Sequence, residues 1–378
     1  EKTDFYLGQA HRIRAYYYFY MLRTWGGVPL VTEPKVATGA TSPNELYTAR
    51  STEAEILDFL KKEINLSESY FKDDNFTLTS KRETWSKAAT LMLKAEIYLW
   101  AAKVKTDGNP PASPSDDLTT AAQALTAVEA SGKFGLLSSF QDIFAYNNKG
   151  NNEIILTLHY EKGEAEQNLR RFMYDIPMMA SWYDKEGIPM NDPLNVGDRC
   201  ILANEYKWDL FESYDENDTR KYTTFMDFYN QDKTQHGVVL RKFLGTVDNN
   251  IRNYSDDMPL YRYVDLLLMR AEIKNMQGSD PSVEINKIRE RAYTGNAYPS
   301  YTNKSFAENE LAILSERDKE FVREGKRWFD VRRMHDASGN PLAFTQSGLS
   351  QSEAYKLLWP IDTGTMTKDP LVKQTEGY

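Results

Sequence analysis

Apolar residues in the first third of the chain recur every three to four positions, the spacing that places them on one face of a helix. Ile56, Leu60 and Ile64 show this spacing, and the hydroxyl side chains of Ser51 and Thr52 just before them are candidate N-caps. Helix breakers such as paired glycines and prolines separate the periodic segments. The pattern predicts helices over residues 4–24, 53–66, 84–103 and 117–131.

The periodicity is lost after residue 132. Residues 153–160 form a β-prone segment, whereas residues 161–250 mix aromatic residues with Gly, Pro, Asn and Asp. Helical spacing returns at residues 260–277, after Asp280-Pro281 and at about 306–334, and an extended tail begins at Leu357. The sequence therefore predicts a mainly helical protein that is interrupted by an irregular excursion with short strands.

Two of the expected helices contain the same pattern of three apolar residues, a base, Ala, Glu and Ile. It occurs as LMLKAEI at residues 91–97 and as LLMRAEI at residues 267–273. The small Ala lets two helices approach closely, and helix pairs that reuse one packing surface build the core of a helical repeat. We interpret the similarity as a sign of repeated helix pairs; the alternative is a chance similarity between two good helices.

Composition narrows the classes of protein that fit. The 378 residues are enough for about two to three structural units or one large fused domain. The net charge is −9, so no basic surface for nucleic acid is expected. Cys200 is the single cysteine, which excludes an internal disulfide and a metal site with several thiolates. Aromatic residues reach 13%, and tyrosine dominates them, a residue whose ring stacks while its hydroxyl group hydrogen-bonds.

The sequence lacks the local signatures of common enzyme sites. It contains no nucleophile elbow, Walker loop or Gly-x-Gly-x-x-Gly motif, and its four histidines are scattered without metal-binding spacing. The acidic run at residues 215–218 resembles part of a calcium loop but lacks the glycine and the distal glutamate of an EF-hand. We therefore expect a solvated turn at 215–218, no catalytic residue, no cofactor and no metal site, with calcium as the alternative at an incomplete motif.

Five blocks of the sequence, taken in order, resemble the signature of the SusD/RagB family. They are RAYYYFYMLRTWGGVPLV at residues 14–31, YRYVDLLLMRAE at 261–272, INKIRERA at 285–292, ERDKEFVREGKRWFDVRR at 316–333, and a tail with Trp359-Pro360-Ile361, Asp369-Pro370-Leu371, Gln374 and Gly377-Tyr378. Each block alone is a weak signal, but together they span nearly the whole chain. In the fourth block, acids and bases alternate around Phe321 and Trp328, which suits an ion-paired helix end that locks the tail onto the bundle.

The resemblance implies a single, mainly α domain over residues 1–378, built from tetratricopeptide-like helix pairs. The helical scaffold is then expected over residues 1–132 and 260–378, and a loop-rich excursion with a few short β-strands and the ligand surface over about 133–259. The resemblance also implies a lipid-anchored protein on the extracellular face of the outer membrane that works with a SusC-like TonB-dependent transporter. The family's lipidated cysteine does not occur in these residues, so the anchor is expected from the resemblance alone.

A surface for sugars needs aromatic rings that stack on apolar C–H faces and polar groups that bind the hydroxyl rims. The excursion offers Tyr174, Trp182, Tyr183 and Trp208 as candidate ligand contacts. The Trp-Tyr pair precedes Gly and Pro residues that are typical of an exposed loop. The alternative is that these rings cover the scaffold, since most aromatic side chains are buried.

Two further candidate ligand contacts lie in the expected scaffold. Arg270 interrupts an apolar helix at a position where the family pattern more often has tyrosine. Its charge needs a partner, which is either a distant carboxylate or the hydroxyl groups of a ligand. The loop after Ala292 contains several tyrosines, of which Tyr298 is the expected contact.

Together these features predict a non-catalytic protein that captures an oligosaccharide and delivers it to the transporter. The alternative is an oligopeptide-binding protein of the same architecture, in which Arg270 and the acidic surface matter more than stacking. An enzymatic function has the least support, because the catalytic signatures are missing.

Overall fold

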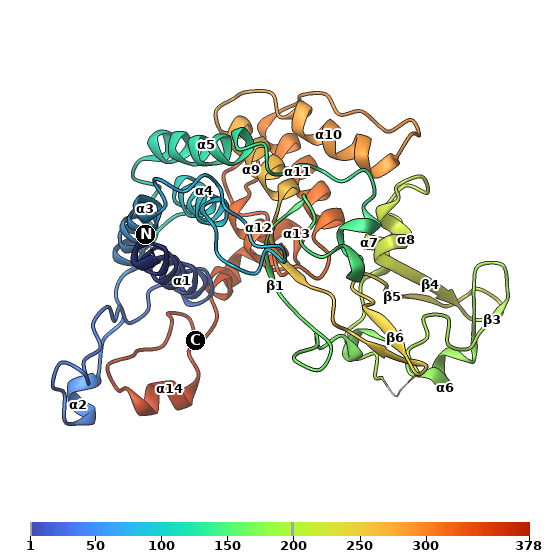
Figure 1. Cartoon of the computed structure of the whole chain (residues 1–378), viewed down its shortest axis with the longest axis horizontal. Helices are drawn as coiled ribbons and strands as arrows, with labels where there is room; N and C mark the ends of the chain where they lie inside the picture. The colour runs from blue at the N-terminus through green and yellow to red at the C-terminus, as the bar shows by residue number, and fades with distance from the viewer. Residues whose placement is uncertain (1, 198–199) are drawn as a thin grey trace.

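The computed structural model describes residues 2–197 and 200–378, and its architecture is mainly α-helical (Figure 1). The longer helices are α1 (Lys2–Trp25), α3 (Glu53–Tyr70), α4 (Lys87–Lys103), α5 (Pro114–Ala130), α9 (Tyr263–Met276), α10 (Ser282–Tyr293) and α11 (Phe306–Glu320). The shorter helices are α2 (Pro43–Leu46), α6 (Ile176–Met179), α7 (Trp208–Glu212), α8 (Arg220–Thr224), α12 (Arg327–Arg333), α13 (Ala343–Gln346) and α14 (Thr363–Lys368). Short 3₁₀ helices form at Gln141–Ile143, Tyr146–Asn148, Arg170–Phe172 and Gln351–Leu357.

The strands are short and lie mostly in the excursion. They are β1 (Ile154–Leu158), β2 (Trp182–Tyr183), β3 (Pro189–Met190), β4 (Phe225–Tyr229), β5 (His236–Leu240), β6 (Thr246–Asp248), β7 (Ile251–Asn253) and β8 (Met258–Arg262). They form a four-stranded sheet in the order β3-β2-β4-β5 and the pairs β1-β8 and β6-β7. The expected fold, mainly helical with a few short strands, is confirmed. Within residues 2–197 and 200–378, no helix combines the length and the apolar character that crossing a bilayer requires.

Local capping explains where the first long helices begin. Thr52 starts α3 with a capping box, because its hydroxyl group accepts a hydrogen bond from Glu55 N at 3.1 Å and the Glu55 carboxylate accepts one from Thr52 N at 2.8 Å. Ser86 caps α4 in a similar way by accepting from Ala89 N at 3.3 Å. The helices predicted in the first third of the chain all form close to their predicted bounds.

The segment predicted as a helix over 260–277 begins as a strand. Residues Met258–Arg262 form β8, which pairs antiparallel with β1 so that Ile154 lies opposite Arg262. Helix α9 starts only at Tyr263, whose backbone N–H donates to Glu153 O at 2.8 Å. A long-range ladder therefore overrides the local helical pattern at this boundary.

The last part of the chain also differs from its predicted pattern. The expected helix over 306–334 is interrupted between α11 and α12, where Arg323 and Gly325 adopt φ angles of 67° and 73°. These left-handed conformations cannot continue an α-helix. The tail, predicted to be extended, contains α14, which Asp362 caps by accepting from Thr365 N at 3.0 Å.

Two large hydrophobic cores and a small cluster of Phe140, Ile143 and Ile154 stabilise the described part of the molecule. The larger core lies in the helical scaffold, where α4 is buried on nearly every side and contacts α3, α5 and α9. The smaller core lies in the excursion and packs aromatic and aliphatic side chains, such as Phe211, Phe225 and Val239, around the four-stranded sheet. In Figure 1 the sheet of the excursion stands to one side of the helices.

The internal sequence repeat falls on α4 and α9, which contact one another. The glutamate of each copy forms an ion pair with an arginine of another helix. Glu96 of α4 lies 2.7 Å from Arg23 of α1, and Glu272 of α9 lies 2.7 Å from Arg333 of α12. The repeated Glu therefore ties each copy to a neighbouring helix.

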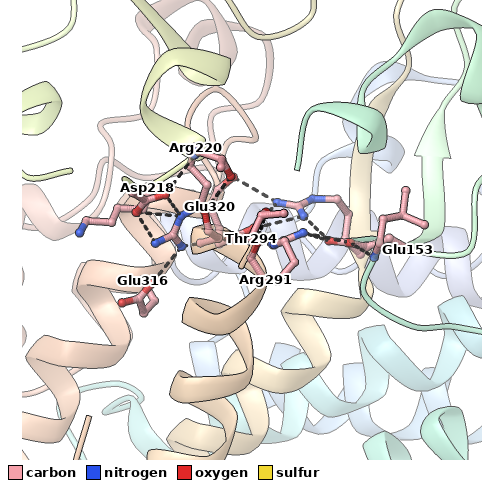
Figure 2. A network of polar contacts seen from close by, with 12 residues as sticks. Glu153, Asp218, Arg220, Arg291, Thr294, Glu316 and Glu320 are labelled. Carbon is pink, nitrogen blue, oxygen red and sulfur yellow. Dashed lines mark hydrogen bonds and ion pairs between the residues drawn. The ribbon is translucent and has the colours of Figure 1, made fainter. Parts of the chain in front are cut away.

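A network of buried ion pairs joins the excursion to the scaffold (Figure 2). At its centre, Glu320 of α11 accepts hydrogen bonds from Arg220 of α8 at 3.0 Å and from Arg291 of α10 at 2.8 Å. The other acidic members in the same view are Glu153, Asp218 and Glu316. The fourth sequence block is thus ion-paired as expected. The partners of this network lie in the excursion, on β8 and on α10, so the network does not make the expected lock on the tail.

Candidate functional site

A cavity of about 420 Å³ is lined by residues of the excursion. Its walls come from segments that are far apart in the sequence, namely residues 141–146, 219–223, 241–245 and Asp256. We call it the excursion cavity. The buried network holds two of these walls, because Arg220 fixes α8 and Lys242 is bound to the segment that follows α11.

The floor of the excursion cavity combines two phenylalanines with a buried ammonium group. The rings of Phe144 and Phe243 pack edge to face at 5.2 Å, and Lys242 Nζ lies 4.3 Å from the centre of the Phe144 ring. Lys242 donates to Glu320 O at 2.9 Å and to Glu324 Oε1 at 2.5 Å. Burial lowers the pKa of Lys242 to about 8, although Glu324 favours the charged form. The ammonium group of Lys242 therefore bonds to the buried ion-pair network beneath the floor of the cavity.

Asp256 supplies a carboxylate oxygen that no described protein group satisfies. The residue is 3% exposed, its Oδ2 accepts from Gly245 N at 2.5 Å, and its buried Oδ1 has no hydrogen-bond partner in the described chain. Gly245 permits this turn because its φ is +59° and a Cβ atom there would lie 1.9 Å from Asn253 O. A buried acceptor without a donor is costly.

Replacing Asp256 with asparagine is expected to stabilise the protein above about pH 6. Burial raises the pKa of Asp256 from 3.8 to about 6, so the folded state favours the protonated acid. A difference of about two pKa units corresponds to a destabilisation of the folded wild type by about 3 kcal/mol. This destabilisation is absent below about pH 4 and develops as the pH rises through about 6, because the buried carboxylate then ionises. The amide keeps an oxygen for Gly245 N and has no charge to bury.

Thermal unfolding of both proteins at a series of pH values checks this prediction. The gap in stability between Asp256→Asn and the wild type should widen between about pH 4 and pH 7 in favour of the variant. A gap that stays constant over this range would show that the carboxylate is already well solvated.

The rim of the excursion cavity offers an aromatic ring and free donors. Tyr222 is half-buried, and its hydroxyl group donates to Glu216 Oε2 at 3.1 Å, which holds the ring in place. Burial is the main cause that raises the pKa of Tyr222 to about 12, so the hydroxyl stays protonated. The exposed guanidinium of Arg241 has no hydrogen bond or ion pair with any described residue. The rim can therefore stack on a ligand and donate hydrogen bonds to it.

Aromatic side chains continue from the rim across one face of the four-stranded sheet. Tyr183 of β2 lies opposite Tyr229 of β4, so these side chains share a face, and the Trp208 ring lies 5.9 Å from that of Tyr229. Phe211 links this group to the cavity, with ring distances of 5.9 Å to Tyr222 and 4.9 Å to Trp208. We call Tyr183, Trp208 and Tyr229 the aromatic face. The structure thus brings two of the predicted contacts, Tyr183 and Trp208, together beside the cavity.

Two other predicted contacts point into the smaller core. Trp182 is the strand neighbour of Tyr183 and packs edge to face on Phe228 at 5.0 Å. Tyr174 is fully buried, and its hydroxyl group donates to Asp192 Oδ1 at 2.5 Å. The Tyr174 ring is therefore a buried packing residue, which was the alternative to a ligand contact, and a ligand cannot reach it in this structure. Trp182 and Tyr183 form strand β2 in place of the expected loop, and adjacent residues of a strand face opposite ways.

The two candidates from the scaffold lie away from the excursion cavity and do not line it. Arg270 forms an ion pair with Glu129 of α5 at 2.8 Å, and Glu129 also accepts from Tyr263 at 3.1 Å. The partner of Arg270 is thus a distant carboxylate, which is one of the two partners that the sequence allowed, and not the hydroxyl groups of a ligand. Tyr298 packs against Tyr293 of α10 at 6.5 Å. The structure therefore does not gather Trp182, Arg270 and Tyr298 into one cleft.

The acidic run at 215–218 is a turn, but it is only partly solvated. Asp218 is buried and forms an ion pair with Arg220 at 2.7 Å, whereas Glu216 pairs with Lys221. Two of its three carboxylates, those of Asp218 and Glu216, are thus paired with protein cations. Among the residues that the structure describes, no group of three or more His, Cys, Asp or Glu side chains could hold a metal ion.

Sequence reasoning missed most of the residues that form the excursion cavity. Phe144, Tyr222, Phe243 and Asp256 belong to no motif and come from segments without periodicity. The one signal in their favour is the abundance of aromatic residues in the excursion, which does not say which rings line a cavity.

Comparisons with known proteins agree on one family. Residues 178–378 match the model of the SusD family. SusD-like protein P38 of Formosa agariphila is 27% identical, in a match that covers 99% of this chain and 74% of that protein. A crystal structure of a SusD superfamily protein from Bacteroides fragilis has a TM-score of 0.89 and 37% identity, and the match covers 99% of this chain and 80% of that one. The starch-binding protein SusD of Bacteroides thetaiotaomicron is 29% identical over 32% of this chain and 22% of its own length.

Proposed function

The chain belongs to the SusD family, and we propose that its excursion cavity and aromatic face bind an oligosaccharide without altering it. The name of the starch-binding relative supports a carbohydrate as the class of ligand. The proposal uses Tyr183 and Trp208 of the sequence-based candidates, and adds Tyr222 and Asp256 from the cavity.

One observation carries the proposal. The excursion cavity places aromatic rings beside the Asp256 carboxylate and beside the Arg241 guanidinium, which bonds to none of the described residues. Sugars present apolar C–H faces for rings and hydroxyl rims for donors and acceptors. Arg270, which would favour a peptide ligand, is already paired with Glu129.

The composition of the cavity also supports binding without catalysis. Asp256 is the only acidic residue among the residues that line it. Hydrolysis of a glycosidic bond ordinarily needs two carboxyl groups on either side of the scissile bond. A lone carboxylate with a raised pKa is instead a good hydrogen-bond partner for a hydroxyl group.

We extend the proposal to the setting of the protein. We place it on the extracellular face of the outer membrane, held by a lipid anchor, where it passes its ligand to a SusC-like TonB-dependent transporter. This part rests on family membership and on the order of the sequence blocks. A modest affinity suits such a role, because a very tight complex releases its ligand slowly.

Replacing Tyr222 with alanine is expected to weaken glycan binding by about tenfold or more, because a stacking ring and its rim contact are lost. Calorimetry with a panel of neutral and acidic oligosaccharides measures the effect. Tyr17→Ala is the matched control, since Tyr17 is 62% exposed on α1 and does not line the excursion cavity.

Calorimetry with a peptide digest, and an assay of reducing ends after incubation with the glycans, separate the competing functions. A peptide digest that binds in place of every glycan would favour the oligopeptide alternative. New reducing ends after incubation would show an enzyme. Equal affinities of the wild type and Tyr222→Ala for a bound glycan would remove the excursion cavity as its site.

A further inference from the structure

A second cavity, of about 740 Å³, lies between α12, the C-terminal segment and the loops that follow α1 and α4. We call it the C-terminal cavity. It shares no lining residue with the excursion cavity. Its apolar lining includes Phe344, Tyr355, Leu357 and Leu358, and its charged lining includes Arg50, Glu53, Asp107 and Arg332.

Arg332 is a buried cation without a carboxylate partner. The residue is 7% exposed, its Nη1 donates to Arg23 O, and its guanidinium lies 5.4 Å from the centre of the Trp100 ring. No carboxylate of the described residues lies within ion-pair distance of it. Its neighbour Arg333, by contrast, pairs with Glu272 at 2.7 Å. Burial lowers the pKa of Arg332 to about 10, and the attraction of Glu53 offsets only part of this effect.

Of the three acidic residues that line the C-terminal cavity, Glu376 is exposed, and Glu53 and Asp107 are engaged by backbone groups. Glu53 accepts a hydrogen bond from Asp107 N at 2.7 Å. The Asp107 carboxylate accepts from Glu53 N and Ala54 N, each at 3.0 Å, at the start of α3. These carboxylates therefore leave Arg332 unpaired, and they disfavour a second negative charge in the cavity.

A second arginine adds positive charge and uses most of its donors in hydrogen bonds to the backbone. Arg50 donates to Gly27 O and Trp25 O at 2.6 Å and to Lys373 O at 3.1 Å. No carboxylate lies within ion-pair distance of its guanidinium among the described residues. The lining thus contains one buried guanidinium that can accept an anionic partner, next to an apolar wall.

We propose that the C-terminal cavity binds a small monocarboxylate with an apolar body. The carboxylate pairs with the Arg332 guanidinium, and the apolar body lies against Phe344 and Leu357. Hydrogen bonds between charged partners are strong in a buried site, so the carboxylate supplies both affinity and orientation. Glu53 and Asp107 make the cavity select one negative group over two. This site is separate from the proposed glycan site and does not depend on it.

Phenylbutyrate is a suitable probe, with phenylbutyramide as its uncharged match and phenylsuccinate as a dicarboxylate. Binding to the wild-type chain can be followed by calorimetry and by saturation-transfer NMR. Phenylbutyrate is expected to bind about tenfold or more tightly than the amide, because the charge-assisted contact is lost. Phenylsuccinate should bind more weakly than phenylbutyrate.

Two variants locate the site. Arg332→Met removes the guanidinium and should abolish the difference between acid and amide, provided that thermal unfolding shows a folded protein. Ala354→Trp adds a ring at an exposed lining position without touching Arg332 and should block both probes. Tyr17→Ala should bind like the wild type. Equal binding of acid and amide, no binding of phenylbutyrate, or unchanged binding in Ala354→Trp would overturn the proposal.

Discussion

Glu320→Gln is expected to lower the free energy of unfolding by about 3 to 5 kcal/mol, because breaking a buried ion pair leaves an uncompensated charge. Glu320 lies 3.0 Å from Arg220 and 2.8 Å from Arg291, and 3.4 Å from Arg262. Glutamine keeps the shape of the side chain but removes the charge that all three arginines share. Urea denaturation measures the loss. Glu353→Gln is the control, since its pair with Lys356 is exposed and screened by solvent, so its loss should leave the stability nearly unchanged.

Acid titration tests the same network. Burial raises the pKa of Glu320, but Arg291, Arg220 and Arg262 outweigh it and lower the pKa to about 2. The stabilisation from this carboxylate is therefore complete above its ordinary pKa of about 4.3 and is lost as the pH falls towards 2. In Glu320→Gln, the free energy of unfolding should no longer show the part of its fall between about pH 4 and pH 2 that comes from protonation of Glu320. A variant as stable as the wild type at neutral pH would show that the network does not hold the excursion.

Phe243→Ala is expected to lower the free energy of unfolding by about 3 to 5 kcal/mol, as for other buried phenylalanines. Phe243 is 2% exposed and packs on Phe144 in the floor of the excursion cavity. Its φ angle is 66°, a left-handed conformation that disfavours a side chain with a Cβ atom. Backbone strain of this kind is often kept where it positions a binding surface.

The strain gives the prediction a second part. Phe243→Gly loses the same ring but relieves the left-handed conformation, so it should be about 1 kcal/mol more stable than Phe243→Ala. Urea denaturation of both variants measures the difference. If alanine were the more stable replacement, the left-handed backbone at this position would not be strained.

The sequence predicts the helical scaffold well, because its signals are local. Spaced apolar residues and the Thr52 cap place α3, and the same reasoning places α4. The start of α9 cannot be found this way, since it depends on the pairing of β8 with β1, which lies about 100 residues earlier in the chain by numbering. Local patterns do not reveal such a partner.

The candidate site is less predictable from sequence, for two physical reasons. Trp182 and Tyr183 were expected in a loop, but they form strand β2, where the period of two sends neighbouring rings to opposite faces. The excursion cavity itself depends on buried ion pairs, such as that of Arg220 with Glu320, that hold distant segments together. Spacing along the chain carries no information about such pairs, so Tyr222 and Asp256 could not be identified.

Hydrogen exchange of the amide groups, with and without a bound glycan, tests most directly whether the excursion cavity is the binding site. We predict slower exchange in residues 141–146, 219–223 and 241–245 when the glycan is present, and little change in α1. Protection confined to the C-terminal cavity, or to helices away from the excursion, would contradict this account.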